Sequence, residues 1–444
     1  MNNRHAVVFA SVLVFAAAQS GHMQTRIARA SCSLIQNAKI LDPESGSVLV
    51  GSSILIRGER IAYVGNSPPG SLEHCQKLKL PSLILLPGLI DTHTHLLTTD
   101  TGFGADFSKE LLRTVLESSD RRIHSAKEHA RALLMSGFTT VRDLGNSGRF
   151  LDTVLRREIE ANRIAGPRLF CSGPGFAAPE GQFATYTSDE VAAREYTLVR
   201  LKADFGKLLQ PYKSESSDWI KIYADNDPNP NSLSLKQLKV LIETVHANHF
   251  KAAVHTTTEQ SARNALDARA DSLEHGLELS DRTLQLMAAK RTYLVPTDLN
   301  RTLCAVIRSK APNGDCGDFE TYQRQMSARL KRALKYGVPI AFGSDMYLDL
   351  SGSGFDRGQA AKETLFAYVE NGMSPLEALK SATTQAANLL GKATVLGTIR
   401  PGAFADLIGV SGNPLQDIKS LNSIRFVMKG GRIFINQQGF AASQ

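Results

Sequence analysis

From about residue 85 to residue 390 the chain alternates short apolar runs with longer amphipathic stretches, and this rhythm constrains the fold more than any other feature. The short runs are typical of β-strands, and there are eight: LILLPGLID, GFTTVRD, PRLFCSG, DWIKIYAD, FKAAVHT, ADSLEHG, RTYLVPT and VPIAFGSD. The stretches between them carry helix start signals at Ser188, Ser234 and Ser280. Strands that alternate with helices form parallel βαβ units, so the rhythm predicts an α/β fold, a (β/α)8 TIM-like barrel. A doubly wound open sheet is the alternative.

The segments on either side of this region are typical of β structure. Near the N-terminus, short β-rich runs are separated by the turn sequences DPESG and RGER, and ADLIGVSGNP and IRFVMKGGRIFI near the C-terminus look similar. Two β segments from opposite ends of a barrel most simply form one small domain together. We therefore expect a small β-sandwich formed by both chain ends, residues 30–84 plus 393–440, and a barrel over residues 85–392.

The first residues have the pattern of a cleaved secretory signal. A basic start, MNNRH, precedes the apolar run Ala6–Ala18, which is short for a membrane span and ends in small residues. We expect a signal peptide over residues 1–18, whose end could extend to about residue 22, and hence export to the periplasm or the extracellular space. An uncleaved anchor or a buried helix is the alternative. No other segment approaches a transmembrane length, so we expect no membrane span in the mature chain.

The five cysteines fit an exported protein without requiring disulfides. Cys304 and Cys316 flank a polar surface segment, and Cys32 and Cys75 flank the first strands expected in the small domain, so either pair could form a bridge. Cys171 has the surroundings of a buried strand residue. Because the number is odd, at least one thiol stays free or pairs between chains.

The formal net charge of +8 is spread along the chain rather than concentrated in a stripe, and no nucleic-acid-binding motif accompanies it. We therefore expect a small-molecule partner and no nucleic acid. A homo-oligomer is compatible with the sequence.

Side chains that can bind metal or titrate lie at the ends of five of the eight predicted strands. They are His93, His95, Lys221, His255, His275 and Asp345. Catalytic residues of such barrels lie at the C-terminal ends of the strands. Each residue is a weak signal alone, because a lone histidine is more often a core or surface residue and Asp345 could be a helix cap. Together they predict a metal site, and four imidazoles with a carboxylate suit Zn²⁺ or another borderline divalent ion.

Lys221 stands in the middle of WIKIY, a run typical of a buried strand, although lysine is rarely buried without a partner. Its ammonium form cannot bind metal because it has no lone pair. An ion pair with an acid such as Asp225 is the ordinary explanation.

The motifs PGLIDTHTH, WIKIYAD, AVHTTT, SLEHG, AFGSD and LGTIRPGAFADLIGV together resemble the amidohydrolase superfamily, in its imidazolonepropionase-like and prolidase-like (Xaa-Pro dipeptidase) binuclear branch. The resemblance extends from about Cys32 to Ile435. It implies that Lys221 is carboxylated by CO₂ and that its carbamate bridges two divalent metal ions, expected to be Zn²⁺. It also implies the ligand sets: His93, His95 and Asp345 for the more buried metal, and His255 and His275 for the more exposed one.

The resemblance further implies an exported hydrolase that cleaves amide or peptide C–N bonds by attack of a metal-bridged hydroxide, with Asp345 as the catalytic proton carrier. Lys221 and the export signal favour dipeptides or N-acyl amino acids over the imidazolonepropionase reaction. A lactone or cyclic-amide hydrolase is the alternative, and a non-catalytic binding homologue a remote one.

A substrate of this kind carries a carboxylate, which needs a cation or a hydroxyl group to bind. Tyr223, on the same strand face as Lys221, and Arg142, in TTVRD, are the candidates. Packing of Tyr223 and a strand-end network between Arg142 and Asp143 are the structural alternatives.

Overall fold

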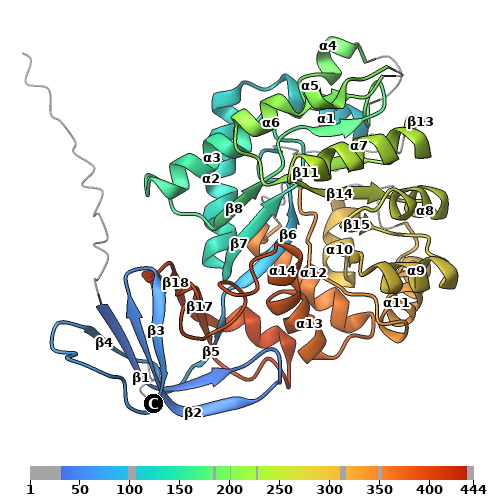
Figure 1. The fold of residues 1–444 in the computed structure, drawn as a ribbon. Coiled ribbons are helices and arrows are strands. Elements are labelled where there is room, and N and C mark those ends of the chain that lie inside the picture. The colour runs from blue at the N-terminus through green and yellow to red at the C-terminus, as the bar shows by residue number, and fades with distance from the viewer. Residues whose placement is uncertain are drawn as a thin grey trace, which may run out of the picture.

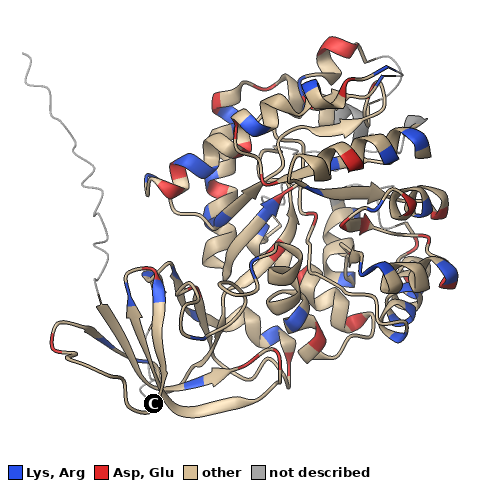
Figure 2. Cartoon of the chain, in the orientation of Figure 1, with Lys and Arg blue, Asp and Glu red and all other residues tan. Residues whose placement is uncertain are grey.

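The computed structural model describes residues 32–98, 107–183, 187–200, 202–226, 229–310, 317–348 and 353–437. The predicted signal peptide lies outside the described residues. The chain is an α/β protein in which a mixed sheet lies beside a larger body of parallel strands and helices (Figure 1). Basic and acidic residues are interspersed over the face shown in Figure 2.

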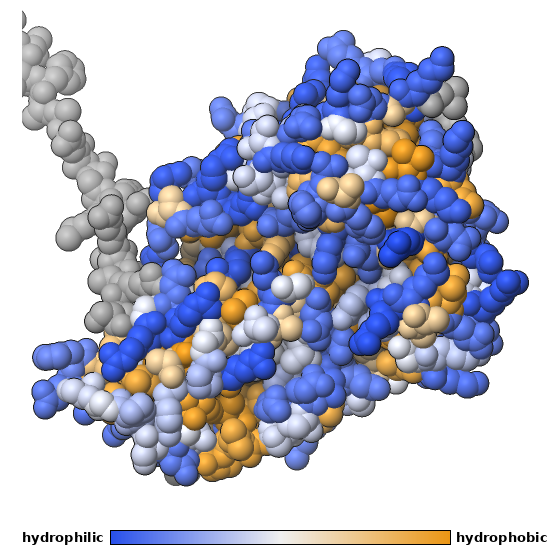
Figure 3. Space-filling view, viewed as in Figure 1, coloured by the Kyte–Doolittle hydropathy of each residue, from blue (hydrophilic) through white to orange (hydrophobic). Residues whose placement is uncertain are grey.

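Strands from both ends of the chain share one eight-stranded mixed sheet, in the order β19-β18-β17-β5-β1-β2-β3, with β4 paired to β1. The N-terminal strands are β1 (Cys32–Leu41), β2 (Val48–Arg57), β3 (Arg60–Gly65), β4 (Gln76–Lys79) and β5 (Ile84–Pro87). The C-terminal strands are β17 (Leu407–Val410), β18 (Ile424–Lys429) and β19 (Arg432–Asn436). Because β5 pairs with both β1 and β17, it joins the two ends of the chain. Apolar atoms gather at the lower edge of the view in Figure 3, in the region of this sheet.

The other long strands run parallel to one another in two sheets. The first contains β6 (Leu89–Thr94), β7 (Phe138–Asp143) and β8 (Arg168–Cys171). The second has the order β10-β9-β11-β14-β15-β16, formed by β9 (Gly175–Ala177), β10 (Tyr196–Leu198), β11 (Trp219–Tyr223), β14 (Lys251–Thr256), β15 (Ser272–His275) and β16 (Tyr293–Val295). A small hairpin, β12 (Asp225–Asn226) and β13 (Asn229–Ser232), follows β11.

Hydrogen bonds connect the two parallel sheets at two places, one between β8 and β11 and the other between β6 and β16. At one junction, the N–H of Asp218 donates to the carbonyl of Cys171 at 2.8 Å. At the other, residues 339–345 lie between β6 and β16, because the N–H groups of Thr92 and Leu294 each donate to this segment at 2.9 Å. The segment is the predicted eighth strand, and it forms isolated bridges to its neighbours rather than a regular strand.

The helices pack around these sheets, as Figure 1 shows. The longer ones are α1 (Phe107–Leu116), α2 (Ser119–Met135), α3 (Leu151–Glu160), α7 (Leu235–Ala247), α8 (Glu259–Asp267), α9 (Asp281–Lys290), α10 (Arg301–Lys310), α11 (Phe319–Lys335) and α12 (Arg357–Glu370). The shorter ones are α4 (Asp189–Ala192), α5 (Phe205–Leu208), α6 (Gln210–Ser214), α13 (Pro375–Ser381), α14 (Thr384–Leu389) and the 3₁₀ helix η1 (Ile418–Ser423). Ser188, Ser234 and Ser280 cap helices α4, α7 and α9, which confirms the predicted start signals. Within the described ranges, no helix is long and apolar enough to cross a membrane.

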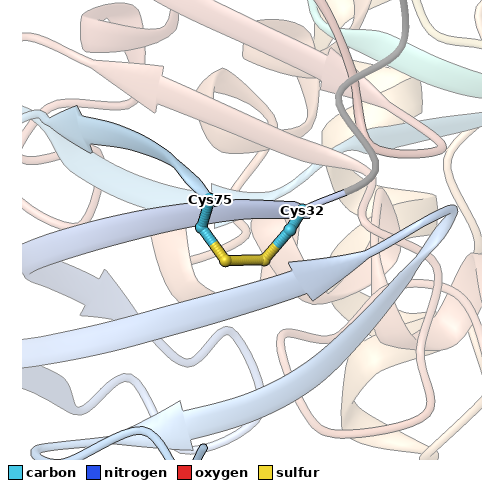
Figure 4. The surroundings of a disulfide bond; sticks show 2 residues. All are labelled: Cys32 and Cys75. Carbon is cyan, nitrogen blue, oxygen red and sulfur yellow. A yellow bond between two sulfur atoms is a disulfide. The ribbon is translucent and has the colours of Figure 1, made fainter. Parts of the chain in front are cut away.

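One predicted disulfide is present, between Cys32 at the start of β1 and Cys75 just before β4 (Figure 4). The Cα atoms are 4.6 Å apart, and the bridge closes a loop of 43 positions. Cys171 is free and buried, as predicted. Cys304 is disulfide-bonded, whereas Cys316, its predicted partner, lies outside the described residues.

Candidate metal centre

The six side chains predicted to bind metal lie together at the C-terminal end of the parallel strands. His93 is on β6 and His95 follows it, Lys221 is on β11, His255 on β14, His275 ends β15, and Asp345 ends the segment 339–345. Because parallel strands end at one edge, residues distant in sequence meet there. All are buried except Asp345, whose side chain is 22% exposed. Solvent or a substrate can therefore reach its carboxylate.

His93, His95 and Asp345 form the tightest group. Their potential ligand atoms all lie within 4.8 Å of one another. The Oδ1 atom of Asp345 is 2.9 Å from Nε2 of His95 and 3.4 Å from Nε2 of His93. Two imidazoles and a carboxylate converging on one small volume are a donor set that suits a divalent metal ion.

The other two histidines extend this group. The ring of His275 is 5.2 Å from that of His93 and 4.6 Å from that of His255. Burial lowers the pKa of His93 to about 4 and that of His275 well below its usual range. Both imidazoles are therefore neutral near pH 7, which is the form that binds metal.

Lys221 is fully enclosed in β11, and its Nζ atom lies 3.2 Å from Nε2 of His93. Burial lowers the pKa of Lys221 to about 8, although Glu274 and Asp345 oppose the shift. A lower pKa raises the fraction of neutral amine, which is the form that reacts with CO₂. The ordinary explanation of an ion pair with Asp225 does not match the geometry, because that carboxylate contacts His255 and Thr257 instead.

Glu274 contacts one ring nitrogen of His93, and this contact directs the other ring nitrogen toward the cluster. The Nδ1 atom of His93 lies 2.8 Å from Oε2 of Glu274. The oxygen lies to one side of the direction in which the ring N–H points. Glu274 is fully buried, and its other oxygen accepts from Arg142 at 3.0 Å and from Ser272 at 2.5 Å. A carboxylate behind a metal-binding histidine fixes the ring orientation and increases the basicity of the free nitrogen.

Two other histidines are held in the same way. Nδ1 of His95 is 3.3 Å from the carbonyl oxygen of Gly145, and Nδ1 of His275 is 2.8 Å from the hydroxyl of Thr297. In both rings Nε2 is the nitrogen without such a partner, although Nδ1 of His275 also lies 3.6 Å from Oδ2 of Asp345. This arrangement matches His93, so three histidines offer the same atom to a metal.

His255 has the opposite arrangement. Its Nε2 atom lies 3.3 Å from Oδ1 of Asp225, which leaves Nδ1 as the potential ligand. Asp225 is itself held by the N–H and hydroxyl of Thr257 at 3.0 and 3.1 Å. Every histidine of the cluster thus has one oriented nitrogen available, and the residues present fit a site for divalent metal ions.

Two of the candidate ligands have a backbone conformation that is unusual for residues other than glycine. His275 has φ of 67° and Asp345 has φ of 52°. Nη1 of Arg329 donates to the carbonyl of His275 at 2.5 Å, and Arg329 also pairs with Asp298 in the protein interior. Strained backbone held by buried contacts is frequent at functional sites.

The geometry argues against the predicted contact between Arg142 and a substrate. Arg142 is fully buried, it donates to Glu274 and to the carbonyl of Thr92, and its guanidinium lies 4.3 Å from the ring centre of Trp219. It does not form the alternative strand-end network either, because Asp143 accepts from Leu96 and Thr94. Arg142 instead forms an ion pair with Glu274 and so helps to hold this carboxylate in place.

Tyr223 lies beside the cluster, with its ring 5.4 Å from that of His255 and 5.2 Å from Nζ of Lys221. Its hydroxyl donates to Oδ1 of Asn146 at 3.3 Å. Burial raises the pKa of this phenol well above its usual value, so the hydroxyl stays protonated. The contact between Tyr223 and a substrate remains a prediction.

Sequence reasoning missed Glu274, Asp225 and Thr297 as partners of the histidines. Glu274 carried a usable signal, because a carboxylate in the buried run SLEH is as unexpected as the lysine in WIKIY. Asp225 begins the short strand β12 and Thr297 lies in a loop, and only the tertiary structure shows which histidine each one meets.

Comparison with known proteins places this geometry in a family. The model of the amidohydrolase family matches residues 84–434. Ochratoxinase from Aspergillus niger is 27% identical over 434 residues, which cover 89% of this chain and 85% of the relative. Imidazolonepropionase from Porphyromonas gingivalis is 22% identical over 413 residues, which cover 86% and 89%.

Among solved structures, a Xaa-Pro dipeptidase with methionine bound in its active site superposes with a TM-score of 0.76 and 26% sequence identity. The match covers 91% of this chain and 100% of that one. The chain belongs to the amidohydrolase family and is an enzyme that hydrolyses carbon–nitrogen bonds.

Proposed function

We propose that the chain is an exported, binuclear metal-dependent amidohydrolase that cleaves the amide or peptide bond of dipeptides or N-acyl amino acids. The cluster of four oriented histidines, Asp345 and buried Lys221 carries this proposal. The similarity to a Xaa-Pro dipeptidase supports the substrate class. Export rests on the N-terminal sequence, residues 1–18.

We also propose that the parallel strands form one closed (β/α)8 barrel over residues 85–392. The hydrogen bonds at both junctions between the two sheets, with residues 339–345 as the eighth strand, support this closure. The mixed sheet would then be the small sandwich, built from residues 30–84 and 393–440.

Two divalent ions, expected to be Zn²⁺, would activate water and polarise the scissile carbonyl when bound in this cluster. His93, His95 and Asp345 would hold one ion, and His255 and His275 the other. Lys221, as a carbamate, would be shared between the two. The neutral imidazoles and the lowered pKa of Lys221 support this assignment.

Asp345 is the residue best placed to move a proton. Burial raises the pKa of Asp345, but the neighbouring histidines outweigh this effect and hold the pKa far below its usual value, so the carboxylate is ionised at neutral pH. Its partial exposure allows contact with water and substrate. Asp345 would accept a proton from the attacking water and deliver it to the leaving nitrogen.

The test is a mass-spectrometric screen for amino-acid release. The mature chain, loaded with zinc in the presence of bicarbonate, is given a mixed library of dipeptides and N-acyl amino acids. We expect release of a consistent C-terminal residue, and the Asp345→Asn variant serves as the inactive control. A wild-type sample that holds two metal ions per chain and releases nothing would reject this substrate class, and lactones and cyclic amides would be tested next.

A further inference from the structure

A basic cavity of about 490 Å³ lies at the end of the parallel strands opposite the metal-ligand cluster. Lys251, the first residue of β14, lines it, whereas His255 lies near the other end of the same strand. Four residues of strand span about 13 Å, so the cavity is separate from the cluster. Its volume lies within the range of small-molecule sites.

The lining of this cavity carries an excess of positive charge. Its basic side chains are His246, Lys251, Arg269, Lys290 and Arg291. The one acidic residue of the lining, Asp271, is already engaged, because its Oδ2 atom accepts from the N–H of Ala252 at 2.8 Å and lies 2.9 Å from Nε2 of His246. Lys251 donates to the carbonyl of Leu389 at 2.8 Å.

The remaining three cations of the lining are available to a ligand. In the described part of the chain, the side chains of Arg269, Lys290 and Arg291 form no hydrogen bond and no ion pair, and all three are exposed at the cavity. Burial lowers the pKa of Lys251, and Arg142 and Lys392 add to this effect against the opposing Asp271. A bound anion would offset this unbalanced positive charge.

Basic residues at helix C-termini commonly neutralise free carbonyl groups, but these helices do not need them. At the end of α8, the N–H of Ala270 donates to the carbonyl of Ala265 at 3.0 Å, and the N–H of Arg269 donates to that of Leu266 at 3.1 Å. The backbone therefore closes this terminus by itself.

The end of α9 is closed in the same way, since Thr292 and Arg291 donate their N–H groups to Met287 and Ala288. Arg269 and Arg291 have φ of 69° and 55°, a conformation in which glycine is usual. Both helices thus place an arginine, rather than glycine, at the residue that turns the chain toward the cavity.

We propose that this cavity is a second ligand site, which binds a small free oxyanion with two negative charges, such as a phosphate or sulfate group, through Arg269, Lys290 and Arg291. Arginine pairs with the oxygens of such groups through two parallel hydrogen bonds. The site is independent of the proposed hydrolase activity, because no metal-ligand candidate lines it.

Selenate, a tetrahedral dianion that anomalous X-ray scattering can locate, is the probe. Calorimetric titration of the metal-loaded full chain at constant ionic strength measures binding, and crystals soaked in selenate locate the ion. We expect a selenate peak in the cavity, and an affinity about tenfold or more weaker in an Arg269→Ala/Arg291→Ala double variant. The matched control is Arg131→Ala/Arg282→Ala, which removes two exposed arginines that do not line the cavity.

Equal affinity in wild type, double variant and control would overturn the proposal, because it would mean that the anion only screens surface charge. A selenate peak confined to the metal-ligand cluster would overturn it as well. If the double variant does not fold, the position of the peak in wild-type crystals decides the question. Loss of amide hydrolysis has no bearing on either readout.

Discussion

Charged side chains inside the strands define this protein at the residue scale. Lys221, Glu274 and Arg142 are all buried where strands usually carry apolar residues. Burial raises the pKa of Glu274, but Arg142 and His93 outweigh this effect and hold the pKa well below its usual range. Glu274 is therefore an ionised partner of Arg142, and it can accept the ring N–H of His93. Such a group is stable in the interior only while its partners remain.

Asp345→Asn should separate metal binding from turnover. The amide oxygen can still bind metal, but the side chain can no longer accept a proton, so we expect most of the metal to remain and the turnover rate to fall by roughly 10²–10⁴-fold. Metal content by elemental analysis and amide hydrolysis by mass spectrometry are measured on the same sample. A variant with near-normal turnover would remove Asp345 from its catalytic role.

Glu274→Gln should weaken metal binding, although Glu274 is not itself proposed as a ligand. The neutral amide leaves Arg142 without a counter-charge and His93 without its carboxylate, and loss of such a partner typically reduces metal affinity by about 10–100-fold. Competition with a chelator measures the affinity, and the exposed Glu128→Gln is the matched control. Unchanged affinity would mean that Glu274 only fills space in the core.

The residues of the candidate site could largely be predicted from sequence, because strand ends and residue types together indicate metal chemistry. The pairing of the histidines with Glu274, Asp225 and Thr297 could not, since it depends on contacts between distant segments. For the same reason, the role of Arg142 could not be predicted from sequence. Its position on β7 suggested a group near the substrate, but its direction into the interior is set by Glu274 and Trp219.

At the element scale, apolar runs in the sequence predicted the long strands. The irregular eighth strand and the short strands depend on local geometry instead. All eight predicted runs contribute to the parallel sheets or to the segment between them. The eighth, VPIAFGSD, is irregular because it must carry Asp345 in a conformation with positive φ. The short strands β9, β10, β12 and β13 lie within connecting segments, and their sequences lack the apolar periodicity that identifies a strand.

Lys429 of β18 should make the free energy of unfolding change with pH in the alkaline range. Burial lowers the pKa of Lys429 to about 8, against the opposing effect of Asp406, and its Nζ atom donates to the carbonyl of Gly166 at 2.6 Å. Between about pH 8 and 10.5 the unfolded chain then binds more protons at this residue than the folded one, so this lysine makes the free energy of unfolding rise with pH.

Urea titrations between pH 7.5 and 10 on wild type and Lys429→Met test this effect. Other titrating groups are common to both proteins, so the difference between the two isolates Lys429. We expect the stability of the variant, relative to wild type, to fall as the pH rises through this window. A difference that does not vary with pH would show that burial does not shift this pKa.

At the scale of the whole molecule, the mixed sheet and the parallel strands are joined through β5 and β6, which are almost continuous in sequence. The Cys32–Cys75 disulfide joins the start of β1 to the residue before β4, within the part of the chain that forms the mixed sheet. Sequence indicated that both chain ends contribute β structure. The order of the strands within the sheet depends on long-range pairing that local patterns do not contain.

Removing this disulfide should lower stability without disturbing the metal-ligand cluster. A Cys32→Ser/Cys75→Ser variant frees a loop of 43 positions in the unfolded chain, so we expect a loss of about 2–4 kcal/mol in the free energy of unfolding. Thermal melts measure the loss, and metal content at low temperature should match wild type. Cys171→Ala, which keeps the bridge, is the control, and a variant that also lost its metal would contradict this separation.

The position of β5 between β1 and β17 has a consequence for how the protein is made. During synthesis β5 emerges well before β17, because the two strands are far apart in sequence, so one edge of β5 stays unpaired until β17 has been made. Pairing between such distant segments is slow to form, and an open strand edge can pair with other chains in the meantime. A nascent chain that lacks β17 therefore carries an open edge at β5 through which it can pair with its copies.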